Sequence, residues 1–131
     1  MTFKPLTSLA KFFLRIGAVS GASAVILGAI GAHKLTKDYK SLNQEKATHL
    51  MAMFEKANKY HFINSTMLIV SSVIARYPLI SCGLFLGSII GFSGPLYYQA
   101  FTTEYSGLNK IAPYGGTCAI LGWLSLVLVN L

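Results

Sequence analysis

The stretch FEKANKYHFINS, residues 54–65, decides how this sequence folds, because a charged, helix-forming segment becomes a hydrophobic one within it. Its last charged residue is Lys59, and the apolar run Met67–Ala75 follows shortly afterwards. Tyr60 stands at the change. Lysine and tyrosine are enriched where a helix passes from the lipid headgroups into hydrocarbon. We therefore predict that this stretch is the entrance to a membrane-spanning helix.

The composition also indicates a membrane protein. Of the 131 residues, 53% are hydrophobic and 11% are charged, which leaves too little polar surface to cover a soluble domain of this size. The formal net charge is +7, but the basic residues flank apolar runs instead of forming a groove interleaved with aromatic side chains. We therefore predict no nucleic-acid partner. A chain of this length is expected to form one domain, residues 1–131.

The apolar runs predict an all-α membrane protein with four transmembrane helices packed through Gly and Ala faces. The helices are expected near 12–33, 58–76, 78–103 and 111–131. The polar segment 34–57 is expected to be a loop that contains a short amphipathic helix in the membrane interface. Ser41 and Gln44 form a capping-box pattern, which starts that helix near Leu42. Pro95 is expected to kink the third transmembrane helix or loosen one of its turns.

Glycines recur at three- and four-residue steps in the first, third and fourth predicted helices, and this spacing places them on one face. Such a face lets two helix backbones approach closely. We predict that these three helices pack through their glycines, whereas the second contributes bulk and polar atoms. The glycines assigned to helix packing are Gly17, Gly21, Gly28, Gly31, Gly83, Gly87, Gly91, Gly115 and Gly122.

A polar cluster is expected where the first helix ends and the second begins. Its predicted members are His33, Asn58, Tyr60, His61 and Asn64. Unpaired carbonyls at a helix C-terminus carry partial negative charge, so we expect His61 to bond a backbone carbonyl near Gly31–His33, or His33 itself. A metal or proton site is the other interpretation. Two histidines without a third ligand do not make a zinc site, so no metal and no cofactor is predicted.

The positions of the four acidic residues argue against coupled transport. Each lies in a predicted loop or at a helix end, whereas proton- or sodium-coupled transporters commonly place a carboxylate near the bilayer centre. The sequence contains no nucleophile–base constellation, phosphate loop or haem-attachment motif, so no enzymatic activity is expected. Cys82 and Cys118 lie in separate apolar runs and are expected to stay as two unbonded thiols.

Four motifs, in this order along the chain, resemble the small transmembrane protein 256 family, also described as domain of unknown function 423. They are GAIGAH at 28–33, FEKANKYHF at 54–62, SGPLYYQAF at 93–101 and APYGGTCAILGWL at 112–124. The residues in these motifs are more similar to those of the animal members than to those of the bacterial ones. The resemblance implies four membrane helices, a mitochondrial association and no enzymatic activity. Asn64 stands where members often carry a second histidine, so a two-histidine mechanism does not carry over.

The N-terminal segment leaves targeting open. Residues 1–15 are basic and contain no acidic residue, which is typical of a mitochondrial targeting segment, of a secretory signal or of the flank of a first membrane helix. Basic residues also flank both sides of the predicted membrane, so the orientation stays open as well.

The leading hypothesis is a non-enzymatic accessory or assembly component of a larger mitochondrial inner-membrane complex, with a respiratory complex among the candidates. Its expected partners are the lipid bilayer and other membrane subunits. The alternative is a small transporter or channel, alone or as a homo-oligomer, in which His61, Asn64 and Gln99 line a path.

Overall fold

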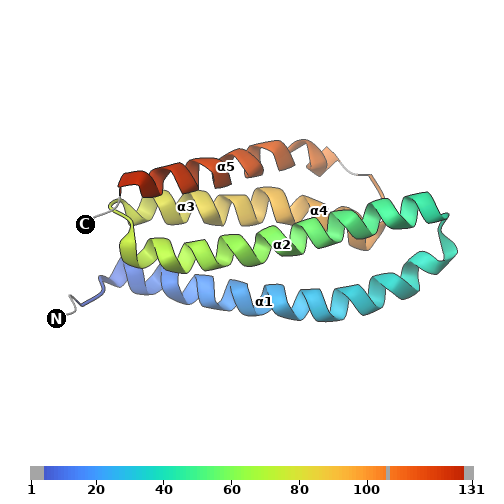
Figure 1. The fold of residues 1–131 in the computed structure, drawn as a ribbon, viewed down its shortest axis with the longest axis horizontal. Coiled ribbons are helices and arrows are strands. Elements are labelled where there is room, and N and C mark those ends of the chain that lie inside the picture. Colours follow the sequence, from blue (N-terminus) through green and yellow to red (C-terminus); the bar gives the residue numbers. More distant parts are fainter. Residues whose placement is uncertain (1–4, 106, 129–131) are drawn as a thin grey trace.

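The computed structural model describes residues 5–105 and 107–128, and its regular elements are helices whose axes lie along one common direction (Figure 1). The chain reverses its direction at each connection between the long helical stretches. The α-helices are α1 (Ser8–Asp38), α2 (Gln44–Ile74), α3 (Pro78–Ser88), α4 (Gly94–Thr102) and α5 (Ala112–Ser125). A π-helical segment, η2 (Ile89–Ser93), joins α3 to α4. Short 3-10 turns are η1 (Tyr39–Ser41), η3 (Gly107–Lys110) and η4 (Leu126–Leu128).

α1 is longer than the sequence suggested. It begins after Thr7, whose side-chain oxygen accepts a hydrogen bond of 3.1 Å from the Ala10 backbone N–H. It does not end at residue 33 but continues to Asp38, which forms an i,i+4 ion pair with Lys34 on the helix surface. The last turns of α1 are therefore polar yet still helical.

The prediction of a loop at 34–57 is wrong, because nearly all of that segment is helical. α2 begins after Asn43, whose side chain accepts a 2.8 Å hydrogen bond from the Lys46 backbone N–H. It then runs without a break to Ile74, so the predicted interfacial helix is the first part of α2 and not a separate element. The physical reason is that no glycine or proline interrupts the sequence from residue 33 to 77.

α3, η2 and α4 together form one continuous helical stretch, Pro78–Thr102, that corresponds to the third predicted helix. Pro78 occupies its first turn, where the missing N–H costs nothing. The loosened turn expected at Pro95 is present, since η2 ends directly before Gly94 and Pro95. A proline cannot donate to the preceding turn, and a π-helical segment is one way for a helix to accommodate that gap.

The helices pack in a simple order. α1 lies along α2, α2 lies against α3 and α4, and α5 lies against α3 and η2. α1 and α5 are therefore at opposite edges of the molecule, and the α1–α2 hairpin extends beyond the shorter α5 (Figure 1). The beginning of α1 and the end of α5 lie at the same end of the bundle.

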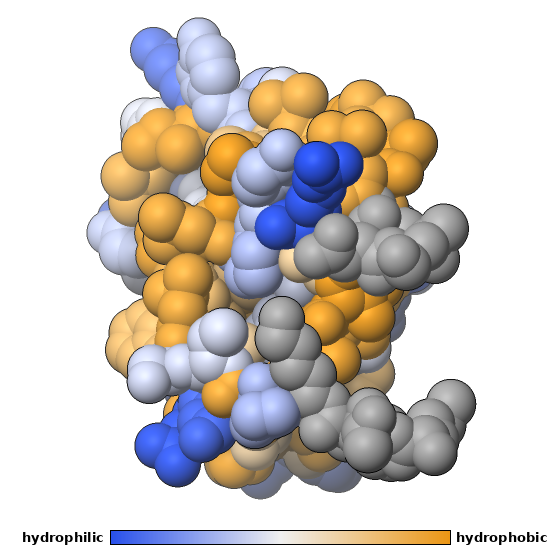
Figure 2. All heavy atoms as spheres, turned by 90° about the vertical axis from the view of Figure 1, so that its left-hand side faces the viewer, coloured by the Kyte–Doolittle hydropathy of each residue, from blue (hydrophilic) through white to orange (hydrophobic). Residues whose placement is uncertain are grey.

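Among the described residues, three helical stretches are long and apolar enough to cross a membrane: Ser8–Ser41, Pro78–Thr102 and Gly107–Leu128. Figure 2 shows apolar side chains over much of the bundle's outside at the end where α1 begins. α2 does not meet that composition, so the fourth membrane span stays a prediction. Much of its polarity is hidden from the surroundings, since its buried polar residues face other helices. These are His61, Asn64, Ser65, Ser71 and Ser72.

The glycines of α1 pack against α2, which differs from the expectation that glycine faces meet one another. A Cβ built on Gly17 would lie 2.6 Å from Ile69 Cγ1, and one built on Gly31 would lie 2.6 Å from Phe54 Cζ. A true glycine-to-glycine contact occurs between η2 and α5. There a Cβ on Gly115 would lie 2.4 Å from the carbonyl carbon of Gly91.

The other predicted packing glycines differ in how closely they are approached. A Cβ on Gly28 would lie 2.8 Å from Asn58 Oδ1, and one on Gly122 would lie 3.0 Å from the Phe85 ring. Gly21 and Gly87 are looser, with nearest atoms at 3.7 and 3.8 Å. Gly83 does not act as a packing glycine within the described residues, because nothing lies within 4 Å of a Cβ built there. Its face of α3 is exposed. The two cysteines are free.

Candidate functional site

His61 is the centre of a hydrogen-bonded cluster that joins three helices. Its side chain is 6% exposed, and both ring nitrogens have partners. Nε2 lies 3.0 Å from Ser20 Oγ on α1, and Nδ1 lies 3.0 Å from the Tyr97 hydroxyl oxygen on α4. Ser65 and Asn58 of α2 complete what we call the His61 cluster.

The direction of each bond in the His61 cluster follows from proton counting. The single Ser65 hydroxyl proton is donated to the His61 carbonyl at 2.7 Å. Ser20 therefore donates to Ser65 Oγ, also at 2.7 Å, and its own oxygen accepts from His61 Nε2–H. His61 Nδ1 is then the acceptor for the Tyr97 hydroxyl proton. This arrangement describes a neutral imidazole protonated on Nε2.

Asn58 closes the other end of the cluster. Its Nδ2 donates to the Tyr97 hydroxyl oxygen at 3.0 Å and to the Ala24 carbonyl at 2.7 Å. The Ala24 carbonyl belongs to the middle of α1, and Gly28 one turn later leaves the room that the Asn58 amide occupies. The chain of bonds thus ends at an amide and, beyond Ser65, at a backbone carbonyl.

The structure brings together only part of the predicted polar cluster. Asn58 and His61 both bond the Tyr97 hydroxyl, but His33 is exposed on α1. The prediction that His61 bonds the end of the first helix near Gly31–His33 is wrong. Because α1 runs on to Asp38, the two antiparallel helices meet in another register, and His61 lies opposite Ser20.

The remaining predicted residues lie on other faces. Tyr60 packs edge-on against Phe92 of η2, with ring centroids 5.3 Å apart. Asn64 donates to Ser88 Oγ of α3 at 3.0 Å. Gln99, the third residue of the transport path considered above, is buried on α4, and its Oε1 has no partner among the described residues.

Sequence reasoning missed three members of the His61 cluster: Ser20, Ser65 and Tyr97. A signal for Ser65 was present, because Asn58, His61 and Ser65 are spaced i, i+3, i+7 and share one helix face. Ser20 could not be found in this way, since its place depends on the register between α1 and α2.

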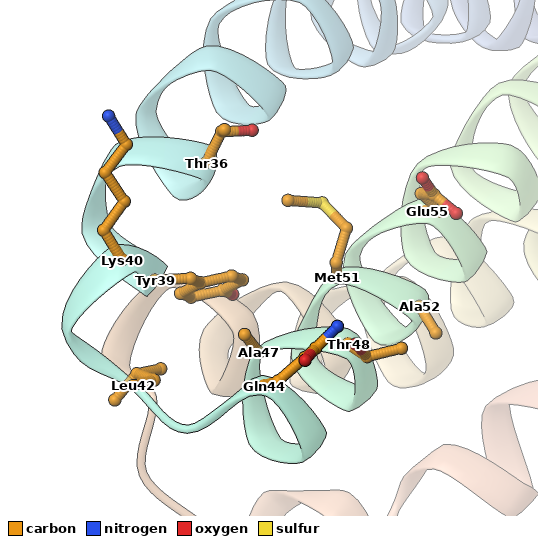
Figure 3. A pocket seen from close by; sticks show the side chains of 10 residues that line it. All are labelled: Thr36, Tyr39, Lys40, Leu42, Gln44, Ala47, Thr48, Met51, Ala52 and Glu55. Atoms are coloured by element: carbon orange, nitrogen blue, oxygen red, sulfur yellow. The ribbon is translucent and has the colours of Figure 1, made fainter.

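A recess of about 620 Å³ lies at the η1 end of the α1–α2 hairpin, away from the His61 cluster (Figure 3). In Figure 3, Met51 extends into the space between the two helices, and the Lys40 side chain points away from it. Tyr39 forms part of the wall, and its hydroxyl donates to the Ala100 carbonyl, which ties the hairpin to α4. Lining residues of both charge signs, Lys40 and Glu55, give this recess no single ligand preference.

Within residues 5–105 and 107–128, no group of three His, Cys, Asp or Glu side chains is placed to hold a metal ion. The His61 cluster itself consists of hydroxyls, one amide and one imidazole whose two nitrogens are already bonded.

Residues 27–116 match the family described as "Protein of unknown function (DUF423)". The chain belongs to this family. The matched region contains every member of the His61 cluster except Ser20. No solved structure matches the chain.

Two relatives of this chain match it over nearly its whole length. The chain is 35% identical over 126 residues to a UPF0382 membrane protein of Staphylococcus epidermidis (strain ATCC 12228), which covers 92% of this chain and 96% of that protein. It is 32% identical over 124 residues to a UPF0382 membrane protein of Staphylococcus aureus (strain bovine RF122), with 92% and 95% covered. These relatives are bacterial, so they support a membrane protein of the family but not the animal-type resemblance.

Proposed function

We propose that this protein is a non-enzymatic integral membrane protein that acts by packing against other membrane subunits, as an accessory or assembly component of a larger complex. One observation carries the proposal: the His61 cluster is closed. Both imidazole nitrogens bond neighbouring helices of the same chain, which leaves them no free position for a substrate. The side chains of the His61 cluster therefore serve to hold α1, α2 and α4 together.

The two edge helices supply surfaces for partners. α1 and α5 each pack on one side only, and their outer faces carry large exposed apolar side chains. On α1 these are Val19, Val25, Ile26 and Ile30; on α5 they are Leu121 and Leu124. Lipid covers such faces in a lone membrane protein, and another subunit's helices can replace it.

The proposed location is the mitochondrial inner membrane. The basic, acid-free segment 1–15 and the resemblance to animal members support it. The staphylococcal relatives support a membrane without supporting an organelle. Imaging and fractionation of a C-terminally tagged chain in its native cell are expected to give a mitochondrial signal; a plasma-membrane signal would contradict this location.

Native electrophoresis in mild detergent tests the proposed role. We expect the 14.2 kDa chain to migrate in a discrete assembly many times its own mass, together with other subunits identified by mass spectrometry. The double variant Ile26→Ala/Ile30→Ala, on the exposed face of α1, is expected to weaken that assembly without unfolding the chain. A homo-oligomer or a lone monomer would refute the accessory role and favour the transporter alternative.

A further inference from the structure

A groove of about 520 Å³ lies between α2, η2 and α5, on a different face of α2 from the His61 cluster. Its volume falls in the range of small-molecule sites. The walls are mainly apolar and aromatic. The residues that matter for its chemistry are Lys56, Tyr60 and Asn64 of α2, Phe92 of η2, and Ile120 and Trp123 of α5.

Asn64 lines the groove and carries a buried oxygen without a hydrogen-bond partner. The side chain is 1% exposed, and its Nδ2 donates to Ser88 Oγ at 3.0 Å. Its Oδ1 has no hydrogen-bond partner in the part of the chain that the structure describes. An unpaired acceptor is strongly unfavourable in an apolar surrounding. A ligand in the groove that donates a hydrogen bond at this depth would satisfy it.

The backbone around the groove is held in an unusual arrangement. Its wall at Phe92 belongs to the π-helical segment η2, and such segments occur frequently at functional sites. The close contact between Gly91 and Gly115 presses η2 against α5 beside the groove. Next to that contact, Gly116 leaves the Phe92 ring uncovered, with a Cβ built there 3.7 Å from the ring.

The depth of Asn64 limits what the ligand can be. Lys56 and Asn64 are eight residues apart on one helix, which is about 12 Å along its axis. A phospholipid with its phosphate at Lys56 would place an acyl chain, which donates no hydrogen bond, beside Asn64. The same holds for any amphiphile whose only hydroxyl stays at headgroup level. The donor must sit on a part of the ligand that enters the hydrocarbon.

We propose that the groove binds a lipid-soluble hydroquinone (quinol). A ring hydroxyl donates to Asn64 Oδ1, the ring packs against Phe92 and Trp123, and the tail leaves along Ile120 into the bilayer. Aromatic rings favour such edge-on and offset contacts, as the Tyr60–Phe92 pair in the same wall already shows. The oxidised quinone carries only acceptor oxygens, so it leaves Oδ1 unpaired and binds more weakly.

Trp123 is the single tryptophan of the chain and lines the groove, so its fluorescence reports on binding. The experiment titrates decylubiquinol, and separately decylubiquinone, into the full chain in nanodiscs and compares the concentrations at half-saturation. The quinol is expected to bind with saturation and the quinone roughly tenfold more weakly, which is what one buried hydrogen bond provides. A quinone that binds as tightly as the quinol would overturn the proposal.

Two variants separate the groove from general partition into the bilayer. Asn64→Leu is expected to abolish the difference between quinol and quinone. Ile120→Phe fills the groove without touching Asn64 and is expected to weaken binding of both, even if Asn64→Leu fails to fold. Val127→Phe, exposed in η4 and outside the groove, is the matched control and is expected to bind like the parent chain. Equal, unsaturable quenching in all variants, or displacement of the quinol by a brominated phospholipid, would refute the site.

Discussion

Ser20 on α1 lies opposite His61 on α2, with Ser20 Oγ 3.0 Å from His61 Nε2. This pair defines the register of the two longest helices, and the neighbouring contacts agree with it. The Ala24 carbonyl of α1 accepts from Asn58 one turn further along, and Gly31 lies against Phe54 beyond that.

A cysteine crosslink can test this register. Ser20 Oγ and Ser65 Oγ are 2.7 Å apart, so the pair Ser20→Cys/Ser65→Cys is expected to form a disulfide on mild oxidation. The background would carry Cys82→Ala and Cys118→Ala to remove the native thiols. Mass spectrometry after alkylation measures the product. The pair His33→Cys/His61→Cys is expected to stay reduced; crosslinking of that pair alone would mean that the helices meet in the register expected from sequence.

The His61 cluster is expected to stabilise the fold. His61→Leu leaves Ser20 and Tyr97 without their partner, and we expect it to lower the free energy of unfolding by ~1–3 kcal/mol. His61→Gln keeps a donor and an acceptor and is expected to be milder. Thermal unfolding in detergent measures both variants. His33→Leu, on the exposed surface of α1, is the control and is expected to unfold like the parent chain.

The energetic coupling between His61 and Tyr97 can be measured with a double-mutant cycle. Tyr97→Phe removes the hydroxyl that His61 and Asn58 both contact. In a double-mutant cycle, the loss in His61→Leu/Tyr97→Phe is expected to be smaller than the sum of the two single losses, because the residues share one interaction. Strict additivity would show that the hydrogen bond does not exist in the membrane.

Two glycines make a matched pair for helix packing. Gly115→Ala would place a Cβ 2.3 Å from the Phe92 backbone nitrogen, so η2 and α5 must separate. We expect lower abundance and a lower melting temperature. Gly83→Ala meets nothing within 4 Å among the described residues and gains helix propensity, worth up to ~1 kcal/mol. It is expected to be neutral or stabilising, and equal damage by both variants would contradict the packing described.

The position of α2 across the membrane can be measured by thiol labelling in sealed vesicles. Lys40, in η1, and Tyr77, between α2 and α3, lie at opposite ends of α2. Lys40→Cys and Tyr77→Cys are expected to react with a membrane-impermeant maleimide from opposite sides. Labelling of both from the same side would show that α2 does not span the bilayer.

Much of the fold could be predicted from apolar runs and prolines. Pro78 marks the start of α3, and Pro95 marks the loosened turn η2 that directly precedes it, because each proline constrains the backbone locally. The end of α1 could not be found in the same way. Hydrophobicity stops at residue 33, but helical structure continues through Lys34 and Asp38, since charged residues suit an exposed helix as well as a loop.

The wrong end predicted for α1 also led to a wrong prediction of the partners of His61. An antiparallel pair places residues opposite one another according to the length of the turn between them, so a longer α1 moves the partner of His61 from His33 to Ser20. The composition of the site was partly visible, because Asn58 and His61 are polar residues in an otherwise apolar helix. Their partners on the other helices were not visible, since these depend on the register in which the helices pack.

The π-helical segment has a consequence for insertions and deletions. Ile89–Ser93 accommodates one residue more than the same length of α-helix would. Deleting one residue there would remove the extra residue and leave an ordinary α-helix, so the helix that follows would rotate little and Tyr97 would still face His61. Deleting one residue between Asn58 and His61 of α2, which is α-helical from Gln44 to Ile74, would instead rotate the two side chains relative to each other by about 100°. A one-residue deletion is therefore expected to be tolerated in η2 and to disrupt the bundle in α2.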